Sequence, residues 1–532
     1  MHISAPSSGR IFRRRDKRFG RKSFLKAIRP LCVALMALTG QVSAQDQPLS
    51  AIGWLNETSR VPVARPVVPP SPEAPVAQGV TLPEVTVMPL GGTRRDAVGL
   101  LPPDVTGLPV SLWIASREAD LETLWERTTA EPMPAVQALY YTLLLAEAEP
   151  PSGDDGAFLA TRVRALMRFG AIEPAHAMLE RAGPDTSELF PLWFDLSLLT
   201  GDEAKPCEAL NKNPALMKSY AAQIFCHARA GDWSTAALLY DSAAPLGLLS
   251  KIEAHLLAQY LDPEMVDDST TLAPPSSPDP LIFSLYEAAG APLPTRSLPR
   301  LFATADLRNT AGWKAEIEAA ERLTRTGALT ENRLLGLYTD RRPAASGGIW
   351  DRVSAVQKFD AALTNGSAEE ISATLPSVWA HMGRVGLQVP FAQLYGQSLA
   401  RRDLTGQTAE LAWRIRLLSS AYESAAKTPP EGADRFLAAL ALGTPTSDLA
   451  TSQLEQSIAE AFASTGAAHR HEAHLREGKL GEAILRAAIL LDRSGPEDYD
   501  EIRDALATLR AVGLEDTARR AALQRLILGQ SR

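Results

Sequence analysis

The sequence has few cysteine and aromatic residues, and it has no long apolar run after its first 44 residues. Of the 532 residues only 3 are cysteine, and Phe, Trp and Tyr together make up 6%. A transmembrane helix needs about 20 consecutive, mostly apolar residues. No segment beyond residue 44 meets that requirement, so the sequence predicts no membrane span in this part of the chain.

Motifs of enzymatic chemistry are also missing. The sequence contains no Gly-x-Ser-x-Gly motif, which positions the nucleophile of many hydrolases. It contains no Gly-rich phosphate-binding loop with a following Lys, and Gly347-Gly348 is typical of a turn. We therefore expect no enzymatic activity, no catalytic residue and no bound cofactor.

The N-terminal 44 residues have the order of a secretory signal peptide. Ten Lys and Arg residues lie between residues 10 and 29, an apolar core runs from Leu31 to Gly40, and small residues follow. We expect cleavage between Ala44 and Gln45 and a mature product in the periplasm, with an uncleaved membrane anchor as the alternative. Arg21-Lys22 resembles a twin-arginine export motif with Lys in the second position, but a basic segment for general secretion is the favoured interpretation.

The charge that remains after cleavage is acidic. The formal net charge of the whole chain is −8. Loss of residues 1–44, which hold ten basic residues and the single acidic residue Asp16, shifts it to −17. Such a surface repels nucleic acid and anionic lipid. We therefore expect no nucleic-acid partner and no stable membrane span after cleavage.

Two cysteines survive cleavage, Cys207 and Cys226. An oxidising compartment favours pairing of such an even set. Two antiparallel helices joined by a turn at Lys212-Asn213-Pro214 would bring the two thiols together. A disulfide there would stabilise the fold by about 3 kcal/mol. Two separate buried thiols are the alternative.

Helical periodicity dominates from residue 112 onward, as in Leu121, Leu124 and Trp125, and hardly any stretch favours strand. The fold class we expect is all-α, an irregular α-solenoid of helical hairpins. The expected organisation is a signal peptide at 1–44, a Pro-rich N-terminal arm at 45–110, a first hairpin array at 111–261, a Pro- and Ser-rich break at 262–280 and a second hairpin array at 281–532.

The N-terminal arm is rich in proline between residues 60 and 79, which favours an extended, solvated chain that builds no core. Residues 80–90 alternate apolar positions around Pro83 and are consistent with a single edge strand or an extended arm. Trp54 lies beyond this tether. Its segment is interpreted either as a peptide that docks on the helices or on a partner, or as a spacer.

Four phrases share the spacing Gly-x4-Ala, each between two helical stretches. A Gly at the end of one helix and an Ala one turn into the next leave room for close helix packing. We interpret them as seams of helical hairpins. The pairs are Gly170 with Ala175, Gly231 with Ala236, Gly478 with Ala483, and Gly513 with Ala518.

These phrases resemble tetratricopeptide-like repeat proteins. The resemblance is carried by Gly231-Asp232-Trp233 with Ala236 and Tyr240, and by Gly478-Lys479-Leu480 with Ala483, Ile484 and Ala487. It implies an α-solenoid of helix–turn–helix units that binds protein partners. The overall layout resembles exported proteins of Gram-negative bacteria, a likeness that implies no activity and no site residue.

Histidines gather at His469, His471 and His474, beside Glu472. Metal ligands on a helix need a spacing of three or four, which His471 and His474 meet and His469 with His471 do not. The favoured interpretation is a solvated helix face without metal. Six tryptophans in helical contexts are interpreted as core residues, with a sugar-binding platform as the alternative: Trp193, Trp233, Trp313, Trp350, Trp379 and Trp413.

Together these features predict an exported, periplasmic, non-enzymatic scaffold or adaptor. Its expected partner is a protein of an envelope-associated assembly, with secretion, polysaccharide export and the flagellar motor left open. The alternative is a glycan- or peptidoglycan-binding or -acting protein.

Overall fold

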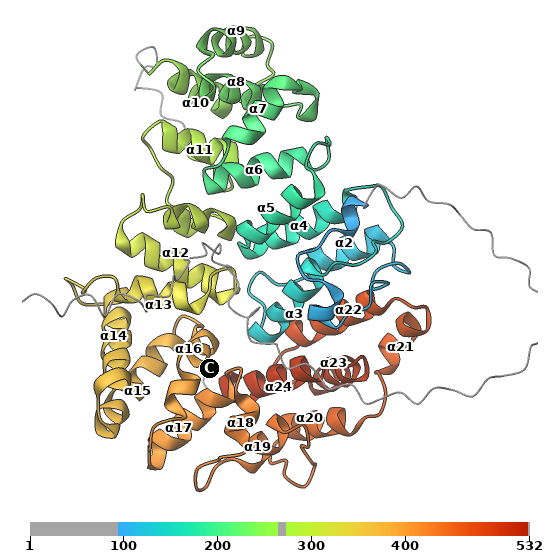
Figure 1. Ribbon diagram of the computed structural model, residues 1–532, viewed down its shortest axis with the longest axis vertical. Helices are drawn as coiled ribbons and strands as arrows, with labels where there is room; N and C mark the ends of the chain where they lie inside the picture. Colours follow the sequence, from blue (N-terminus) through green and yellow to red (C-terminus); the bar gives the residue numbers. More distant parts are fainter. Residues whose placement is uncertain (1–93, 264–272, 530–532) are drawn as a thin grey trace, which may run out of the picture. The chain divides into compact units, whose positions relative to one another are not determined.

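The computed structural model describes residues 94–263 and 273–529, and these residues are mostly helical (Figure 1). Within these two ranges the β structure is limited to two isolated bridges, Leu101 with Ala146 and Arg117 with Ser152. The expected all-α class is confirmed for this part of the chain. The signal peptide, its cleavage site at Ala44 and Gln45, and residues 45–93 of the arm lie outside the described residues.

The described helices before the break begin with short elements and then form longer ones. They are η2 (Arg95–Ala97), α1 (Pro103–Thr106), α2 (Glu118–Glu126), α3 (Pro134–Leu145), α4 (Ala157–Phe169), α5 (Ile172–Ala182), α6 (Phe190–Thr200), α7 (Ala204–Lys212), η3 (Pro214–Leu216), α8 (Tyr220–Arg229), α9 (Trp233–Ala243) and α10 (Lys251–Leu261).

The described helices after the break continue the same pattern. They are α11 (Pro280–Ala288), η4 (Thr295–Ser297), η5 (Arg300–Leu307), α12 (Trp313–Arg325), α13 (Glu331–Thr339), α14 (Ile349–Asn365), α15 (Ala368–Gly383), α16 (Gln388–Leu399), α17 (Gly406–Leu417), α18 (Tyr422–Ala426), α19 (Arg435–Ala441), α20 (Gln453–Ala463), α21 (His469–Arg476), α22 (Leu480–Arg493), α23 (Tyr499–Ala511) and α24 (Glu515–Gly529).

Most helices pack on their neighbours in the sequence, as α4 does with α5, α8 with α9, and α14 with α15. Helix ends are set locally: Ser250, Ser367 and Ser452 each form a reciprocal capping box with a Glu three residues later. On either side of the expected break, α10 packs against α11, and α11 also packs against α6.

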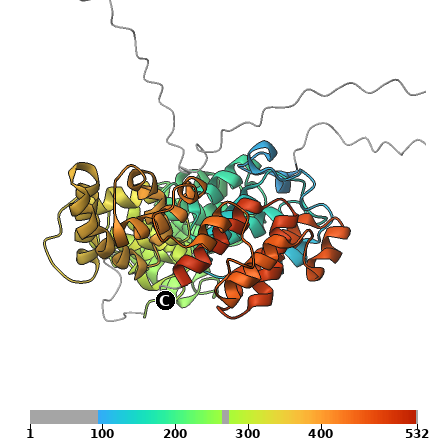
Figure 2. The same ribbon diagram turned by 90° about the horizontal axis from the view of Figure 1, so that it is seen from below.

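Contacts between distant parts of the chain add to these neighbour contacts. Helix α3 packs against α22 and α24, and α4 packs against η5. Both views show the red C-terminal helices beside the blue and teal N-terminal ones (Figure 1 and Figure 2). In an open stack of repeats each unit contacts only its neighbours. The described helices depart from that rule where the C-terminal helices meet α3.

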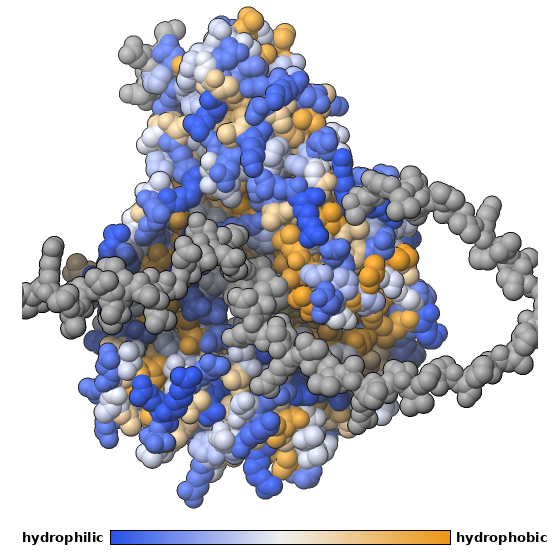
Figure 3. All heavy atoms as spheres, viewed as in Figure 1, coloured by the Kyte–Doolittle hydropathy of each residue, from blue (hydrophilic) through white to orange (hydrophobic). Residues whose placement is uncertain are grey.

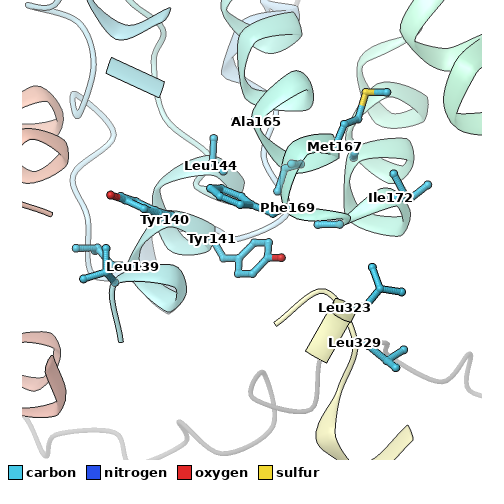
Figure 4. Close-up of a cluster of buried hydrophobic side chains, with 14 of the residues drawn as sticks. Leu139, Tyr140, Tyr141, Leu144, Ala165, Met167, Phe169, Ile172, Leu323 and Leu329 are labelled. Atoms are coloured by element: carbon cyan, nitrogen blue, oxygen red, sulfur yellow. The ribbon is translucent and has the colours of Figure 1, made fainter. Parts of the chain in front are cut away.

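The buried side chains between α3, α4 and α12 show how the distant parts share a core. Tyr140 stacks on Phe169 with ring centroids 6.1 Å apart, and Tyr141 meets Phe169 edge to face at 6.2 Å. Leu323 and Leu329 approach the same cluster from α12 and the turn after it (Figure 4). Burial of a large apolar side chain contributes about 1.5–3 kcal/mol. This cluster therefore stabilises the packing of α3 and α4 against α12.

A buried arginine holds the start of the described chain. The Arg162 guanidinium donates to the carbonyls of Val98, Leu144 and Ala146, each at 2.8 Å. The carboxylate of Asp96 accepts the backbone N–H groups at the start of α4. Burial lowers the pKa of Arg162 to about 10 and raises the pKa of Asp96. These bonds fix residues 96–98 against α3 and α4.

Candidate functional site

The structure contains the disulfide that the sequence predicts. Cys207 on α7 and Cys226 on α8 are bonded, with Cα atoms 4.8 Å apart, and both residues are buried. Helix α7 packs on α8, and α8 packs extensively on α9. The bond therefore ties together the pair of helices that supports α9.

The four Gly-x4-Ala phrases share one backbone geometry. Each Gly has a positive φ of 76–88°. Gly170 is the first residue after a helix, and the other three are each the second residue after a helix. The residue after each Gly donates its N–H to the carbonyl five positions earlier, the bond of a Schellman cap. The four bonds are Ala171 to Leu166, Asp232 to His227, Lys479 to His474, and Leu514 to Leu509.

Gly is favoured at these positions mainly because the backbone there has a positive φ, which other residues rarely adopt. A Cβ at Gly231 or Gly513 would meet nothing within 4 Å, and one at Gly478 would make ordinary contact. At Gly170 a Cβ would come within 2.6 Å of Leu323 on α12, so the close approach there is to a helix distant in sequence and not to the next helix of the hairpin, which is the one we expected. The paired alanines, Ala175, Ala236, Ala483 and Ala518, are all fully buried.

The histidine-rich helix α21 differs from the expected solvated face at one residue. The side chain of His471 is only 4% exposed, and neither ring nitrogen has a hydrogen-bond partner among the described residues. Burial, reinforced by Arg470 and His474, lowers the pKa of His471 to about 4. Across residues 94–263 and 273–529, no three His, Cys, Asp or Glu side chains form a group that could hold a metal ion.

The surroundings of His474 join α21 to the following helix. His474 Nε2 lies 3.5 Å from an oxygen of the buried Glu482, which also accepts from Arg486 at 2.7 Å. The neighbouring Gly481 donates its N–H to the Leu112 carbonyl at 3.1 Å, and a Cβ there would strike the ring of Trp113. The cluster of His474, Glu482 and Arg486 therefore lies where the C-terminal helices pack on residues 112–113.

Exposed apolar side chains concentrate on α8, α9 and the loop after α9. Leu246 is 73% exposed, Leu238 is 67% exposed and Trp233 is 50% exposed, with Tyr220 and Leu248 exposed nearby in the sequence. We call these five residues the α9 surface. Figure 3 shows hydrophobic residues among hydrophilic ones at the α9 end of this view. Exposed apolar groups mark an interaction site where they form a contiguous patch.

The α9 surface was not predicted from the sequence, where Trp233 was interpreted as a core residue. Its ring lies 6.2 Å from that of Tyr260 but stays half exposed. A signal was available: α9 has Asp241 as its one charged residue, and its apolar residues do not keep to one helical face. By contrast, Trp413 is fully buried, as expected.

Cavities lie elsewhere in the described part, and two of them have contrasting linings. One, of about 450 Å³, is lined mainly by polar residues of α14, α16 and the loop after α16, including Asp360, Tyr395 and Arg401. The Tyr395 hydroxyl donates to Asp360 at 3.1 Å, and burial with the adjacent carboxylate raises the pKa of Tyr395. The other, of about 320 Å³, is mainly apolar and lies between α5, α6 and α7.

No protein-family description, no curated protein and no solved structure matches this chain. None of the helices in the described part is both long enough and apolar enough to cross a bilayer. The case for a function therefore rests on the exposed surface and on the sequence.

Proposed function

We propose that this chain is an exported, periplasmic scaffold or adaptor that acts by binding a protein partner and not by catalysis. The partner belongs to an envelope-associated assembly, and secretion, polysaccharide-export and flagellar-motor assemblies all fit the proposal. The observation that carries it is the α9 surface, where Leu238 and Leu246 are 67% and 73% exposed.

The α9 surface has the composition of a protein-binding patch. Trp and Tyr are enriched at binding hot spots, and Leu238, Leu246 and Leu248 add apolar area around Trp233 and Tyr220. Covering one such side chain contributes about 1.5–3 kcal/mol. Helix α9 packs on the rest of the protein through Ala236, Leu239, Tyr240 and Ala243, while Trp233 and Leu238 stay exposed and available to a partner.

The disulfide and the signal-like N-terminus support an exported protein. Disulfides persist in oxidising compartments such as the periplasm. The Cys207–Cys226 bond joins α7 to α8, and α8 packs on α9. A covalent tie there keeps α8 in place when a partner pulls on α9. The tie therefore suits a scaffold that works outside the cytoplasm.

The test is affinity capture of the mature chain from envelope extracts of the source organism, repeated with purified components. The double variant Leu238→Asp/Leu246→Asp introduces charge at exposed positions and should reduce recovery of the partner at least tenfold. Leu442→Asp, at another exposed leucine, is the matched control and should bind normally.

Identical recovery with all three proteins would contradict the α9 surface as the binding site. Co-sedimentation of the chain with purified peptidoglycan, lost in the double variant, would instead favour the glycan-binding alternative.

A further inference from the structure

The apolar cavity between α5, α6 and α7 has the walls of a peptide-binding groove. It has a volume of about 320 Å³, within the roughly 300–1,000 Å³ of ligand pockets. Its apolar lining comes from the loop after α5, from α6, from α7 and from η3: Pro184, Phe190, Trp193, Ala209 and Leu216. Two carboxylates, Glu180 and Asp185, also line it.

One residue of the cavity lining, Trp193, carries a hydrogen-bond donor without a partner in the described part. The indole N–H of Trp193 is buried and, in the part of the chain that the structure describes, has no acceptor. Buried indole N–H groups usually find one. The ring itself is held edge to face by Phe190, with centroids 5.7 Å apart. Aromatic walls with a free donor match grooves that bind polyproline II segments, whose backbone carbonyls are not used internally.

The described chain begins beside this cavity. Residue 94 is the first one described, and the guanidinium of Arg95 pairs with Asp185 at 2.8 Å. Asp185 is one of the two acidic residues of the cavity lining. The N-terminal arm therefore joins the helical part of the protein at the cavity itself.

The arm carries a sequence that fits such a groove. Pro66, Pro69, Pro72 and Pro75 recur at every third position. A polyproline II helix has three residues per turn, so this spacing would place all four rings along one edge. Arg65 precedes the first of them, but the two carboxylates of the lining already have basic partners, Lys205 for Glu180 and Arg95 for Asp185.

The chain between the proline-rich segment and Arg94 is long enough to let that segment reach the cavity. The connection from Pro75 to Arg94 can span about 60 Å at roughly 3.3 Å per residue, and its far end is anchored next to the cavity by Arg95. A covalent connection makes binding of the segment intramolecular, which gives the segment a high effective concentration at the cavity. A segment of the same chain therefore has an advantage over a free peptide or a second copy.

We propose that the α5–α7 cavity binds the Pro66–Pro75 segment of the same chain in the polyproline II conformation. The prolyl rings pack on Trp193, which Phe190 supports from behind, and the Trp193 N–H donates to a backbone carbonyl of that segment. The inference does not depend on the proposed function, because none of the residues of the α9 surface lines the cavity.

Photo-crosslinking in the complete mature chain tests this inference. A benzoylphenylalanine at Val67 should crosslink within residues 180–216, as read by peptide mass spectrometry. The matched control V68P/P69V/P72E/E73P keeps the composition of the arm but breaks the run of four prolines at three-residue spacing, and it should lower the yield at least fivefold. Trp193→Phe keeps an aromatic ring and removes the donor, and it should lower the yield about fivefold.

Three results would overturn the proposal. One is crosslinking outside residues 180–216, and another is an equal yield in the arm with shifted prolines. The third is a crosslink between a ¹⁵N-labelled and an unlabelled molecule in a mixture of the two, which would assign the groove to a second copy. Thermal midpoints of the variants, measured in parallel, separate loss of docking from loss of folding.

Discussion

The carboxylate of Asp492 accepts a hydrogen bond from the backbone N–H of Met133 at 2.8 Å, across 359 positions of the chain. The same carboxylate accepts from the hydroxyl of Thr129. Asp492 lies near the end of α22, and Met133 is the N-cap of α3. One side chain thus satisfies the N–H of the residue before α3 and joins the start of that helix to the C-terminal helices.

Asp492→Ala should destabilise the protein by about 1–3 kcal/mol, because it leaves the N–H of Met133 without its acceptor in a poorly hydrated site. Asp492→Asn keeps one carbonyl oxygen and should cost less. Urea unfolding followed by circular dichroism measures both. Asp500→Ala, which removes an exposed carboxylate paired with Arg503, is the control and should change stability by less than about 0.5 kcal/mol. Equal effects of Asp492→Ala and Asp500→Ala would contradict this role.

Replacing both Cys207 and Cys226 by Ser should lower the free energy of unfolding by about 3 kcal/mol, since the bond closes a loop of 19 positions. The physical reason is the larger conformational freedom of the unfolded chain without the bond. Urea titrations of the oxidised protein and the double variant measure the difference. Intact mass after alkylation without reductant should show no modified cysteine in the mature protein, and two modified cysteines would rule the bond out.

Ala236→Leu should destabilise the protein by about 1–3 kcal/mol, because Ala236 is fully buried under the first turn of α9 and extra carbons overpack the seam. The next residue offers a matched control, since Ala237 is exposed. Ala237→Leu should stay within about 0.5 kcal/mol of the wild type. Thermal melts of the two variants make the comparison, and similar melting temperatures would argue against a packed seam.

Acid should weaken the fold through His471. Its pKa is lowered from 6.5 to about 4 by burial, so the unfolded chain binds the proton more readily than the folded one. Stability contributed by the neutral ring is present above pH 6.5 and is lost as the pH falls toward 4, by up to about 3 kcal/mol. His471→Leu should flatten this dependence in urea titrations at several pH values. His469→Leu, at an exposed histidine, should leave it unchanged.

Asp195 should act in the opposite direction. Burial, with the nearby carboxylate of Asp279 as a second cause, raises its pKa from 3.8 to about 7. The folded state then binds the proton more tightly, so stability falls as the pH rises from 4 to 7. Asp195→Asn should stabilise the protein by about 1–3 kcal/mol at pH 8, a range below the full shift because the side chain keeps some solvent contact. Asp202→Asn, at an exposed position, is the control, and equal effects would contradict the assignment.

What was predictable from the sequence is what depends on nearby residues. Helical periodicity predicted the all-α class, and the Gly-x4-Ala spacing marked four helix ends that close with a Schellman bond. The pairing of Cys207 with Cys226 was also within reach, because two helices joined by a short turn bring the thiols together. Each of these features is set by the chain within about 20 residues of itself.

Only the tertiary structure decided the features that need a distant partner. The Asp492 contact with Met133, the packing of Gly481 on Leu112 and the burial of His471 depend on which helices meet. Periodicity tells which face of a helix is apolar, but it does not tell which other helix covers that face. The same limit applies to α9, since Trp233 was expected in the core and the fold left it half exposed, with Leu238 on the same helix 67% exposed.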